Sequence, residues 1–217
     1  MIRRVLEWLF PRKCILCRGL LTKEETDLCR RCRTDQPEYR YGKRRIQHIA
    51  DLTALWMYEG AVRGSLHRYK FRGARHYAPA YGRLLAMRVG KDLPQPDLIT
   101  WVPVSAKRRR ERGYDQVELL ANTVAGELGI PMERTLDKFR DNQPNSELKT
   151  QPERRANVLG VYKAVDPERF RGKRVLLLDD IVTTGATASE CARVLRTAGA
   201  EEIYFAAIAA AGNPSSK

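Results

Sequence analysis

Residues 174–187, RVLLLDDIVTTGAT, place four hydrophobic residues before two adjacent acids and a turn of threonines and glycine. The hydrophobic run is typical of a buried parallel strand, and a helical pattern begins directly after the turn. At the carboxyl end of such a strand, the following helix offers free backbone N–H groups and the positive end of its dipole. The stretch therefore indicates either an anion site or a plain strand, polar turn and capped helix.

The residue types in this stretch favour a sugar phosphate. Glycine lets the backbone approach an anion closely, and threonine hydroxyls add hydrogen bonds. Carboxylates would repel the same phosphate, so hydroxyl groups or a metal are their useful partners, and a ribose beside a phosphate meets both demands. No GxxxxGKS/T or GxGxxG motif offers a different nucleotide site. The expected phosphate ligands are Thr183, Thr184, Gly185, Ala186 and Thr187, with Asp179 and Asp180 on the ribose.

Strand and helix patterns alternate on either side of this stretch. Strands are predicted over 52–58, 98–104, 174–180 and 201–210, and amphipathic helices over 61–73, 76–89, 117–129 and 186–200. Residues 107–116, KRRRERGYDQ, are expected to form a charged loop, and residues 138–158 a loop with one short helix. Strands that alternate with helices predict an α/β fold with a parallel sheet flanked by helices.

The composition is strongly basic. The 217 residues include 40 Lys and Arg against 26 acids, a formal charge of +14, which favours anionic partners such as nucleic acid, phosphates or an acidic protein. No apolar run approaches the roughly 18 residues that span a bilayer. Residues 1–10 lack a signal-peptide cleavage site and contain Glu7, so they are expected to form an amphipathic helix in a cytoplasmic protein.

Four of the five cysteines lie in the first 50 residues, as two CxxC pairs separated by eleven residues: Cys14, Cys17, Cys29 and Cys32. Two such pairs can place four thiolates around one zinc ion at about 2.3 Å, which closes the coordination shell. An iron–sulfur cluster and chance spacing are the alternatives, and disulfides are disfavoured in the cytoplasm. We expect a structural zinc module over 1–50 and an α/β domain over 51–217. Cys191 lies on an apolar helix face and is interpreted as a buried thiol rather than a nucleophile.

The ordered motifs of the chain resemble a known family. VLLLDDIVTTGAT resembles the phosphoribosyl pyrophosphate loop of type I phosphoribosyltransferases. FPRKCILC, MYEGAVRGSLHRYKFRG, WVPVSAKRRRERGYDQVELLA and QPERRANVLGVYKA, taken in order with the second CxxC, resemble the ComF family of competence-associated proteins over nearly the whole chain.

The resemblance implies a phosphoribosyltransferase-type domain that binds phosphoribosyl pyrophosphate with magnesium. It assigns Asp179 and Asp180 to the ribose hydroxyls and the threonine turn to the 5′-phosphate. The pyrophosphate would be met by Val104, Ser105, Lys107, Arg108 and Arg112. Lys70 and Arg72 match a further family position, on the phosphates or on the surface, and the three histidines, His48, His67 and His76, are interpreted as structural. Asn142 and Asn145 stand where the family usually has threonine and glutamine, so the acceptor side departs from the family pattern.

Three functions remain open at this stage. The family implies an accessory of DNA uptake in competence, which would handle single-stranded DNA beside a helicase-like partner. The loop alone would suit an active phosphoribosyltransferase on an unidentified acceptor. The same pocket could instead serve a sensor that binds phosphoribosyl pyrophosphate without turnover. Basic residues at the second CxxC, Arg30, Arg31 and Arg33, would stabilise thiolates, contact nucleic acid or form a solvated face.

Overall fold

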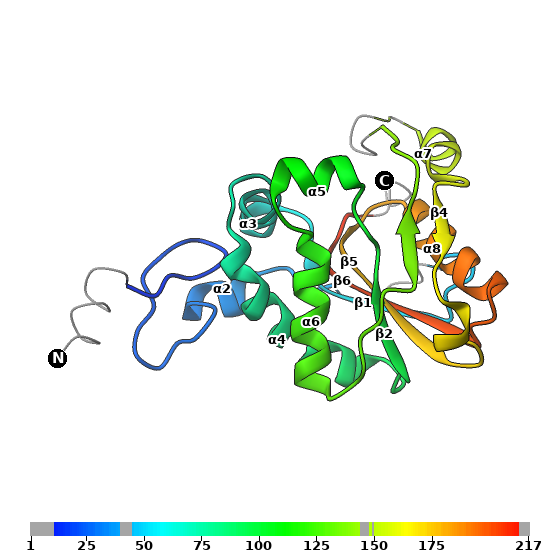
Figure 1. Cartoon of the computed structure of the whole chain (residues 1–217). Coiled ribbons are helices and arrows are strands. Elements are labelled where there is room, and N and C mark those ends of the chain that lie inside the picture. Colours follow the sequence, from blue (N-terminus) through cyan, green and yellow to red (C-terminus); the bar gives the residue numbers. More distant parts are fainter. Residues whose placement is uncertain (1–10, 40–44, 144–147, 149, 213–217) are drawn as a thin grey trace.

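A parallel sheet of four strands forms the centre of the molecule (Figure 1). The computed structural model of the chain describes residues 11–39, 45–143, 148 and 150–212. The strand order is β1-β6-β5-β2, with all pairs parallel. The strands are β1 (Asp51–Met57), β2 (Leu98–Trp101), β5 (Arg174–Val182) and β6 (Glu202–Ala210). The expected α/β class, with a parallel sheet flanked by helices and a small N-terminal four-cysteine module, is confirmed.

Helices cover both faces of this sheet (Figure 1). One face carries α3 (Gly60–Phe71), α4 (Ala78–Asp92) and α6 (Gln116–Leu128), and the other carries α8 (Ala186–Thr197). The remaining elements are α2 (Arg30–Asp35), α5 (Ala106–Arg112), α7 (Gln151–Val158), the 3₁₀ turns η1 (Arg75–Tyr77) and η2 (Pro167–Arg169), and an antiparallel pair, β3 (Leu136–Lys138) with β4 (Tyr162–Ala164). The small β3–β4 sheet was not predicted.

Alternation along β5 divides the core into two clusters. Leu176 and Leu178 pack with residues of α3, α4 and α6, whereas Val175 and Leu177 pack with residues of α8. All four are fully buried, because successive side chains of a strand point to opposite faces and both faces are covered. The side chain of a polar residue that follows in this strand therefore points to one face of the sheet or the other according to its position in the alternation.

The four-cysteine segment packs on the α3–α4 side of the domain. Ile15, Leu16 and Leu28 are buried in the same cluster as the α3 and α4 side chains. Arg68 of α3 donates from Nη2 to the Leu16 carbonyl oxygen at 2.6 Å. A segment that cannot build its own apolar core thus obtains one from its neighbour.

Two predicted elements differ from the structure. Residues 106–112, expected as a charged loop, form helix α5, because the Ser105 side chain accepts from the Arg108 N–H and Gly113 closes the helix at φ +80°. The strand predicted over 98–104 ends at Trp101, just before Pro103, which has no N–H to donate. The helix predicted over 1–10 and the polar tail 213–217 lie outside the described residues. Among the helices that are described, none has the length and apolarity to cross a membrane.

Candidate functional site

A cavity of about 470 Å³ opens at the carboxyl ends of β2 and β5. This is the edge where ligands bind in open α/β sheets, because helix N-termini and strand-end loops converge there. The cavity collects most of the site residues predicted from the sequence: Val104, Arg108, Arg112, Asp179, Asp180, Thr183, Thr184, Gly185, Ala186 and Thr187. Lys70 and Asn142 also line it, whereas Arg72, Ser105 and Lys107 do not.

Residues 183–187, here called the threonine loop, join β5 to α8. Gly185 is the N-cap of α8 and has φ +83°, a left-handed conformation that favours glycine. No side chain caps the helix through a hydrogen bond at Gly185, although the Thr184 hydroxyl accepts from the Ala186 N–H at 3.4 Å. The loop therefore presents a helix N-terminus and hydroxyl groups to the cavity, an arrangement suited to a phosphate.

The two acids of β5 point to opposite faces of the sheet. Asp180 continues the face of Leu178 and is 4% exposed, and Asp179 lies on the face of α8. The pKa of Asp179 is raised well above its ordinary value, first by burial and then by the negative charge of Asp180. Its oxygen Oδ1 accepts from the Asp180 N–H at 2.7 Å. Adjacent acids thus occupy different environments.

Asp180 is held by two neighbours from different helices. Lys70 Nζ of α3 lies 2.7 Å from Asp180 Oδ1, and Gln116 Nε2 of α6 donates to Asp180 Oδ2 at 2.7 Å. Arg112 donates in turn to Gln116 Oε1. This network fixes the buried carboxylate and connects it to the cationic helix α5.

The cationic side of the cavity comes from α5. Arg108 and Arg112 are four residues apart, so both side chains lie on one face of the helix and line the cavity. Lys107 is exposed and is not part of the lining, and Ser105 is 3% exposed and serves as the N-cap of α5. The Arg112 guanidinium also lies 5.4 Å from the centroid of the Phe71 ring.

Two side chains of the RGYDQ segment, residues 112–116, hold backbone groups of neighbouring elements. Tyr114 donates from its hydroxyl to the Tyr69 carbonyl oxygen at 2.6 Å. Asp115 caps α6 by accepting from the Val117 and Glu118 N–H groups, and its other oxygen accepts from the Val104 N–H at 3.1 Å. This carboxylate therefore ties the strand end at Val104 to the start of α6. Burial raises the pKa of Asp115, and the three N–H donors oppose that shift.

One further wall of the cavity was not predicted from the sequence. It comes from the β3–β4 sheet and α7 and includes Lys138, Tyr162 and Arg154. Burial and the nearby Arg108 lower the pKa of Lys138 to about 8, and its Nζ lies 5.6 Å from the centroid of the Tyr162 ring. Asn142 donates to the Asn157 carbonyl oxygen at 2.9 Å, while its own buried Oδ1 has no hydrogen-bond partner among the described residues. Asn145 lies outside the described residues.

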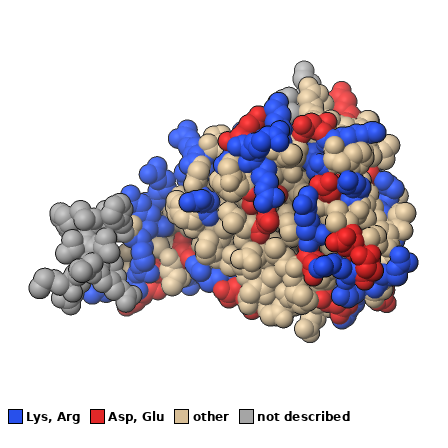
Figure 2. Space-filling view, in the orientation of Figure 1, with Lys and Arg blue, Asp and Glu red and all other residues tan. Residues whose placement is uncertain are grey.

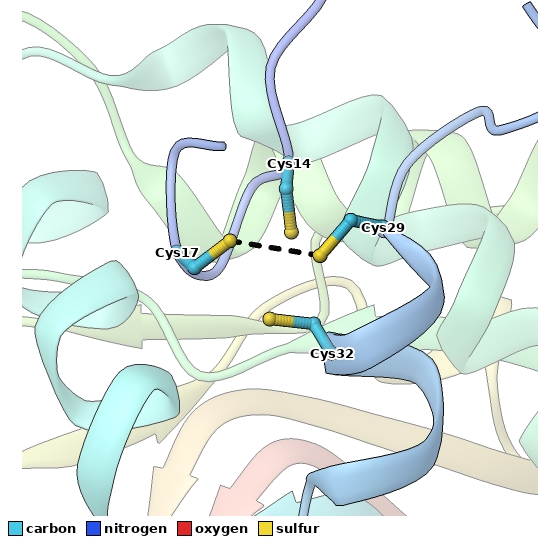
Figure 3. Close-up of side chains that lie close together, drawn as sticks. All are labelled: Cys14, Cys17, Cys29 and Cys32. Carbon is cyan, nitrogen blue, oxygen red and sulfur yellow. Dashed lines mark hydrogen bonds between the residues drawn. The ribbon is translucent and has the colours of Figure 1, made fainter. Parts of the chain in front are cut away.

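A second constellation lies in the N-terminal segment (Figure 3). The Sγ atoms of Cys14, Cys17, Cys29 and Cys32 lie within 4.8 Å of one another and point toward a common centre, with Cys17 and Cys29 only 3.6 Å apart. Four sulfurs at about 2.3 Å from one zinc ion would be separated by about 3.8 Å, so the group fits a tetrahedral ion. The Gly19 N–H donates to Cys17 Sγ at 3.3 Å, which further favours the thiolate.

The other residues singled out from the sequence lie elsewhere. Cys191 is fully buried on α8, and burial raises the pKa of its thiol well above the ordinary value, which agrees with a structural role. The His67 ring packs against Phe71 in a tilted arrangement, and the His76 ring contacts Tyr77 edge-on. His48 lies outside the first cavity, on the lining of a second one.

Two family models match the chain. A phosphoribosyl transferase domain matches residues 118–217, and a double zinc ribbon domain matches residues 5–42. The first match contains β5, the threonine loop and α8, and the second contains the four cysteines. The double zinc ribbon and the four converging thiols indicate a structural zinc ion.

Curated relatives match both parts together. Competence protein F of Haemophilus influenzae is 28% identical over an alignment of 225 positions, which covers 93% of this chain and 98% of that protein. DNA utilization protein YhgH of Salmonella typhi is 31% identical over 64% of this chain and 62% of its own length, so the match spans a little under two thirds of that relative. Among solved structures, glutamine phosphoribosylpyrophosphate amidotransferase from B. subtilis has a TM-score of 0.41 at 27% identity, over 60% of this chain and 26% of that one.

Proposed function

Because this chain is a member of the ComF family, we propose that it binds phosphoribosyl pyrophosphate and assists the uptake of DNA in the cytoplasm. One observation carries the proposal: a single cavity combines the threonine loop, the carboxylate of Asp179 and the cations Arg108 and Arg112. These are the partners that a 5-phosphate, a ribose and a pyrophosphate require. The relatives named for competence and DNA utilization support the cellular role.

The proposed position of phosphoribosyl pyrophosphate follows from the groups that line the cavity. The 5′-phosphate lies on the threonine loop at the N-terminus of α8, and the pyrophosphate lies near Val104, between Arg108 and Arg112. The ribose hydroxyls meet Asp179 and Asp180. A carboxylate has about four acceptor positions, so Asp180 can accept a further hydrogen bond while Lys70 and Gln116 hold it.

Magnesium fits the same cavity. It is usually held by one or two carboxylates together with substrate phosphates and waters, and Asp179 is a carboxylate of the lining that makes no ion pair within 4.0 Å among the described residues. When bound, magnesium would neutralise charge on the pyrophosphate oxygens. The chain itself supplies the cations of α5 and the helix N-terminus of α8.

A calorimetric titration with phosphoribosyl pyrophosphate and magnesium tests the binding proposal. We expect Asp179→Asn and Arg108→Ala each to weaken binding about tenfold or more, since each removes a charge-assisted contact. Asp166→Asn is the matched control, because Asp166 is exposed, lies outside the cavity and has φ +46°, which asparagine tolerates. Wild-type protein that does not bind the ligand would refute the proposal.

Phosphoribosyl transfer is the second candidate function, and Lys138 favours it. In the reaction the C1–oxygen bond to pyrophosphate breaks, the leaving group keeps the electron pair, and C1 bonds to the acceptor nucleophile. Arg108 and Arg112 stabilise the departing charge. With a pKa of about 8, Lys138 is mostly protonated near pH 7 and adds a third cation beside the leaving group, while the proton of the nucleophile passes to the released pyrophosphate or to solvent. Pyrophosphate release from ligand plus candidate bases tests transfer, and binding without release would support a sensor instead.

We further propose that, in competence, the protein contacts single-stranded DNA directly, beside a helicase-like partner. Lys and Arg side chains gather on the four-cysteine module and over α5 (Figure 2). Arg30, Arg31 and Arg33 lie on or beside α2 in that module. A gel-shift assay should show binding that weakens steeply as salt increases, and an Arg30→Ala/Arg33→Ala variant should lower the salt slope. Absence of binding at low salt would remove the direct form of this role.

A further inference from the structure

A second cavity of about 190 Å³ lies against the threonine loop. Thr184, Gly185, Ala186 and Val158 line both cavities, so the loop forms a wall between them. The rest of the second cavity comes from three separate segments, which are residues 45–48, the end of α7, and the first two turns of α8. None of its other lining residues belongs to the site described above.

The lining of this second cavity is strongly cationic. It contains three arginines, Arg45, Arg155 and Arg193, together with His48, against one acid, Glu190. Arg193 and Glu190 neutralise each other through two hydrogen bonds of 2.8 Å. Among the residues that the structure describes, neither Arg45 nor Arg155 forms an ion pair. Two guanidinium groups with no protein anion therefore face one small cavity.

The wall that carries these cations is fixed against the threonine loop. Ile46 is 6% exposed, and a Cβ atom at Gly185 would lie 2.8 Å from Ile46 Cδ1, so backbone and side chain are in close contact. Ala50 donates its N–H to the Ile203 carbonyl oxygen at 2.8 Å, which anchors the same segment to the sheet. The backbone that carries Arg45 and His48 is thus anchored at Ile46 and at Ala50.

We propose that this second cavity binds a phosphoryl group between Arg45 and Arg155, the two arginines of its lining that no described acid neutralises. Guanidinium groups favour phosphate because their planar N–H donors match its oxygens. His48 and Ser189 can add hydrogen bonds from the wall. The phosphoryl group can belong to a small phosphorylated metabolite or to the backbone of single-stranded nucleic acid, since both present the same chemistry.

An occupied second cavity would affect the first one. The ligand would contact Thr184 and Gly185 from the side opposite to the first cavity. Since Ile46 packs directly on Gly185, a shift of the 45–48 segment moves the threonine loop. A ligand in one cavity would therefore affect the other through Gly185.

The three histidines of the chain provide a local test by NMR. In a titration with inorganic phosphate at low ionic strength, the His48 ring signals should shift and saturate, while His67 and His76, which lie outside the second cavity, should not. Arg155→Ala and Arg45→Ala should each weaken that response about tenfold, as expected for loss of one charge-assisted contact. Arg63→Ala, an exposed arginine of α3 outside both cavities, is the matched control.

The outcome separates this proposal from the phosphoribosyl pyrophosphate proposal. His48 signals that do not respond, or that respond equally in Arg155→Ala protein with an otherwise native spectrum, would overturn the second site. Asp179→Asn should keep the His48 response, and Arg155→Ala should keep calorimetric binding of phosphoribosyl pyrophosphate. Uridine monophosphate and a short oligothymidylate, titrated in the same way, identify the source of the phosphoryl group by which one binds more tightly.

Discussion

The four-cysteine group and the acid pair at the end of β5 both crowd groups that repel one another when ionised, yet the chain treats them differently. At the cysteines, four thiols converge, and among the described residues no Lys or Arg side chain is hydrogen-bonded to them. At β5, Lys70 neutralises Asp180 at 2.7 Å, while Asp179 faces a cavity. Where the fold supplies the opposite charge, the ionised group is held within the structure; where it supplies none, we expect a ligand from outside.

Removal of the outside cation from the four-cysteine group should have the largest effect. Binding of structural zinc contributes about 10–16 kcal/mol in small zinc-dependent units, and this module has little core of its own. Cys32→Ser should abolish stoichiometric zinc, and hydrogen exchange should show loss of protection around Ile15 and Leu28. Protection should persist in β5 and β6, because their other face packs in the α8 cluster, which contains none of the four cysteines.

Cys191→Ala is the matched control for the zinc prediction. Cys191 is buried on α8, outside the converging group, so the variant should keep one zinc ion per chain. Unchanged protection of the module in zinc-free Cys32→Ser protein would show that packing on α3 and α4 is sufficient. That result would remove the contrast between the two regions.

Removal of the internal cation should have the next largest effect. Lys70→Met leaves the buried carboxylate of Asp180 without its ion pair, which should lower the free energy of unfolding by about 3 kcal/mol, the low end for buried pairs, because 21% of the Lys70 side chain is exposed. Urea unfolding measures this change. Lys70→Met/Asp180→Asn should recover part of the loss, since asparagine can still accept from Gln116.

An exposed ion pair serves as the control for the Lys70 prediction. Arg169 and Glu133 lie 2.8 Å apart at the surface, and Arg169→Ala should cost less than about 1 kcal/mol. If Lys70→Met were no more costly than Arg169→Ala, Asp180 would not depend on an internal counter-charge. The distinction between the two acids of β5 would then be lost.

Much of this contrast could be predicted from the sequence. The hydrophobic run before Asp179 and the two CxxC pairs identify their elements and their chemistry directly. Which acid is paired could not be predicted, because Lys70 and Gln116 come from helices that are distant in sequence and meet Asp180 only after the sheet is covered. The alternation along β5 does assign the two acids to opposite faces, and that signal was available.

Two sides of the cavity could not be predicted from the sequence, namely the cationic side formed by α5 and the side formed by β3 and β4. The arginine-rich stretch was expected to be a loop, so its residues could not be sorted by face; in α5, the four-residue spacing brings Arg108 and Arg112 to the cavity and turns Lys107 away. Strands β3 and β4 have only three residues each, too few for a period to appear. Lys138 was missed for that reason.

A change in the threonine loop should have a smaller effect on stability. Gly185→Ala places a side chain at φ +83° and 2.8 Å from Ile46 Cδ1, which should cost about 2 kcal/mol of unfolding free energy. Binding of phosphoribosyl pyrophosphate should weaken in parallel, because the loop must shift. Gly126→Ala, in the interior of α6 with open space around it, should instead stabilise by about 0.5–1 kcal/mol. A neutral Gly185→Ala would show that the loop tolerates displacement.

The smallest expected effect concerns Lys138. Like Lys70, it is a lysine that lines the cavity, but it forms no ion pair among the described residues. Its pKa is about 8 in the folded protein, below the unfolded value of about 10.4, so the unfolded chain binds more protons between these pH values. The contribution of Lys138 to stability should therefore rise with pH through this window, by about 1 kcal/mol after discounting for solvent screening.

Urea unfolding at pH 7.5 and 9.5 measures the effect of Lys138, and Lys138→Met should remove the rise, whereas the exposed Lys91→Met should not. A bound anion would stabilise the charged form of Lys138 and raise its pKa, just as an internal anion stabilises Lys70 in its pair with Asp180. Pyrophosphate should accordingly shift the Lys138 titration, followed by NMR, to higher pH. A titration unmoved by saturating pyrophosphate would mean that this lysine does not face the ligand, and that other cations of the cavity, such as those of α5, meet the pyrophosphate.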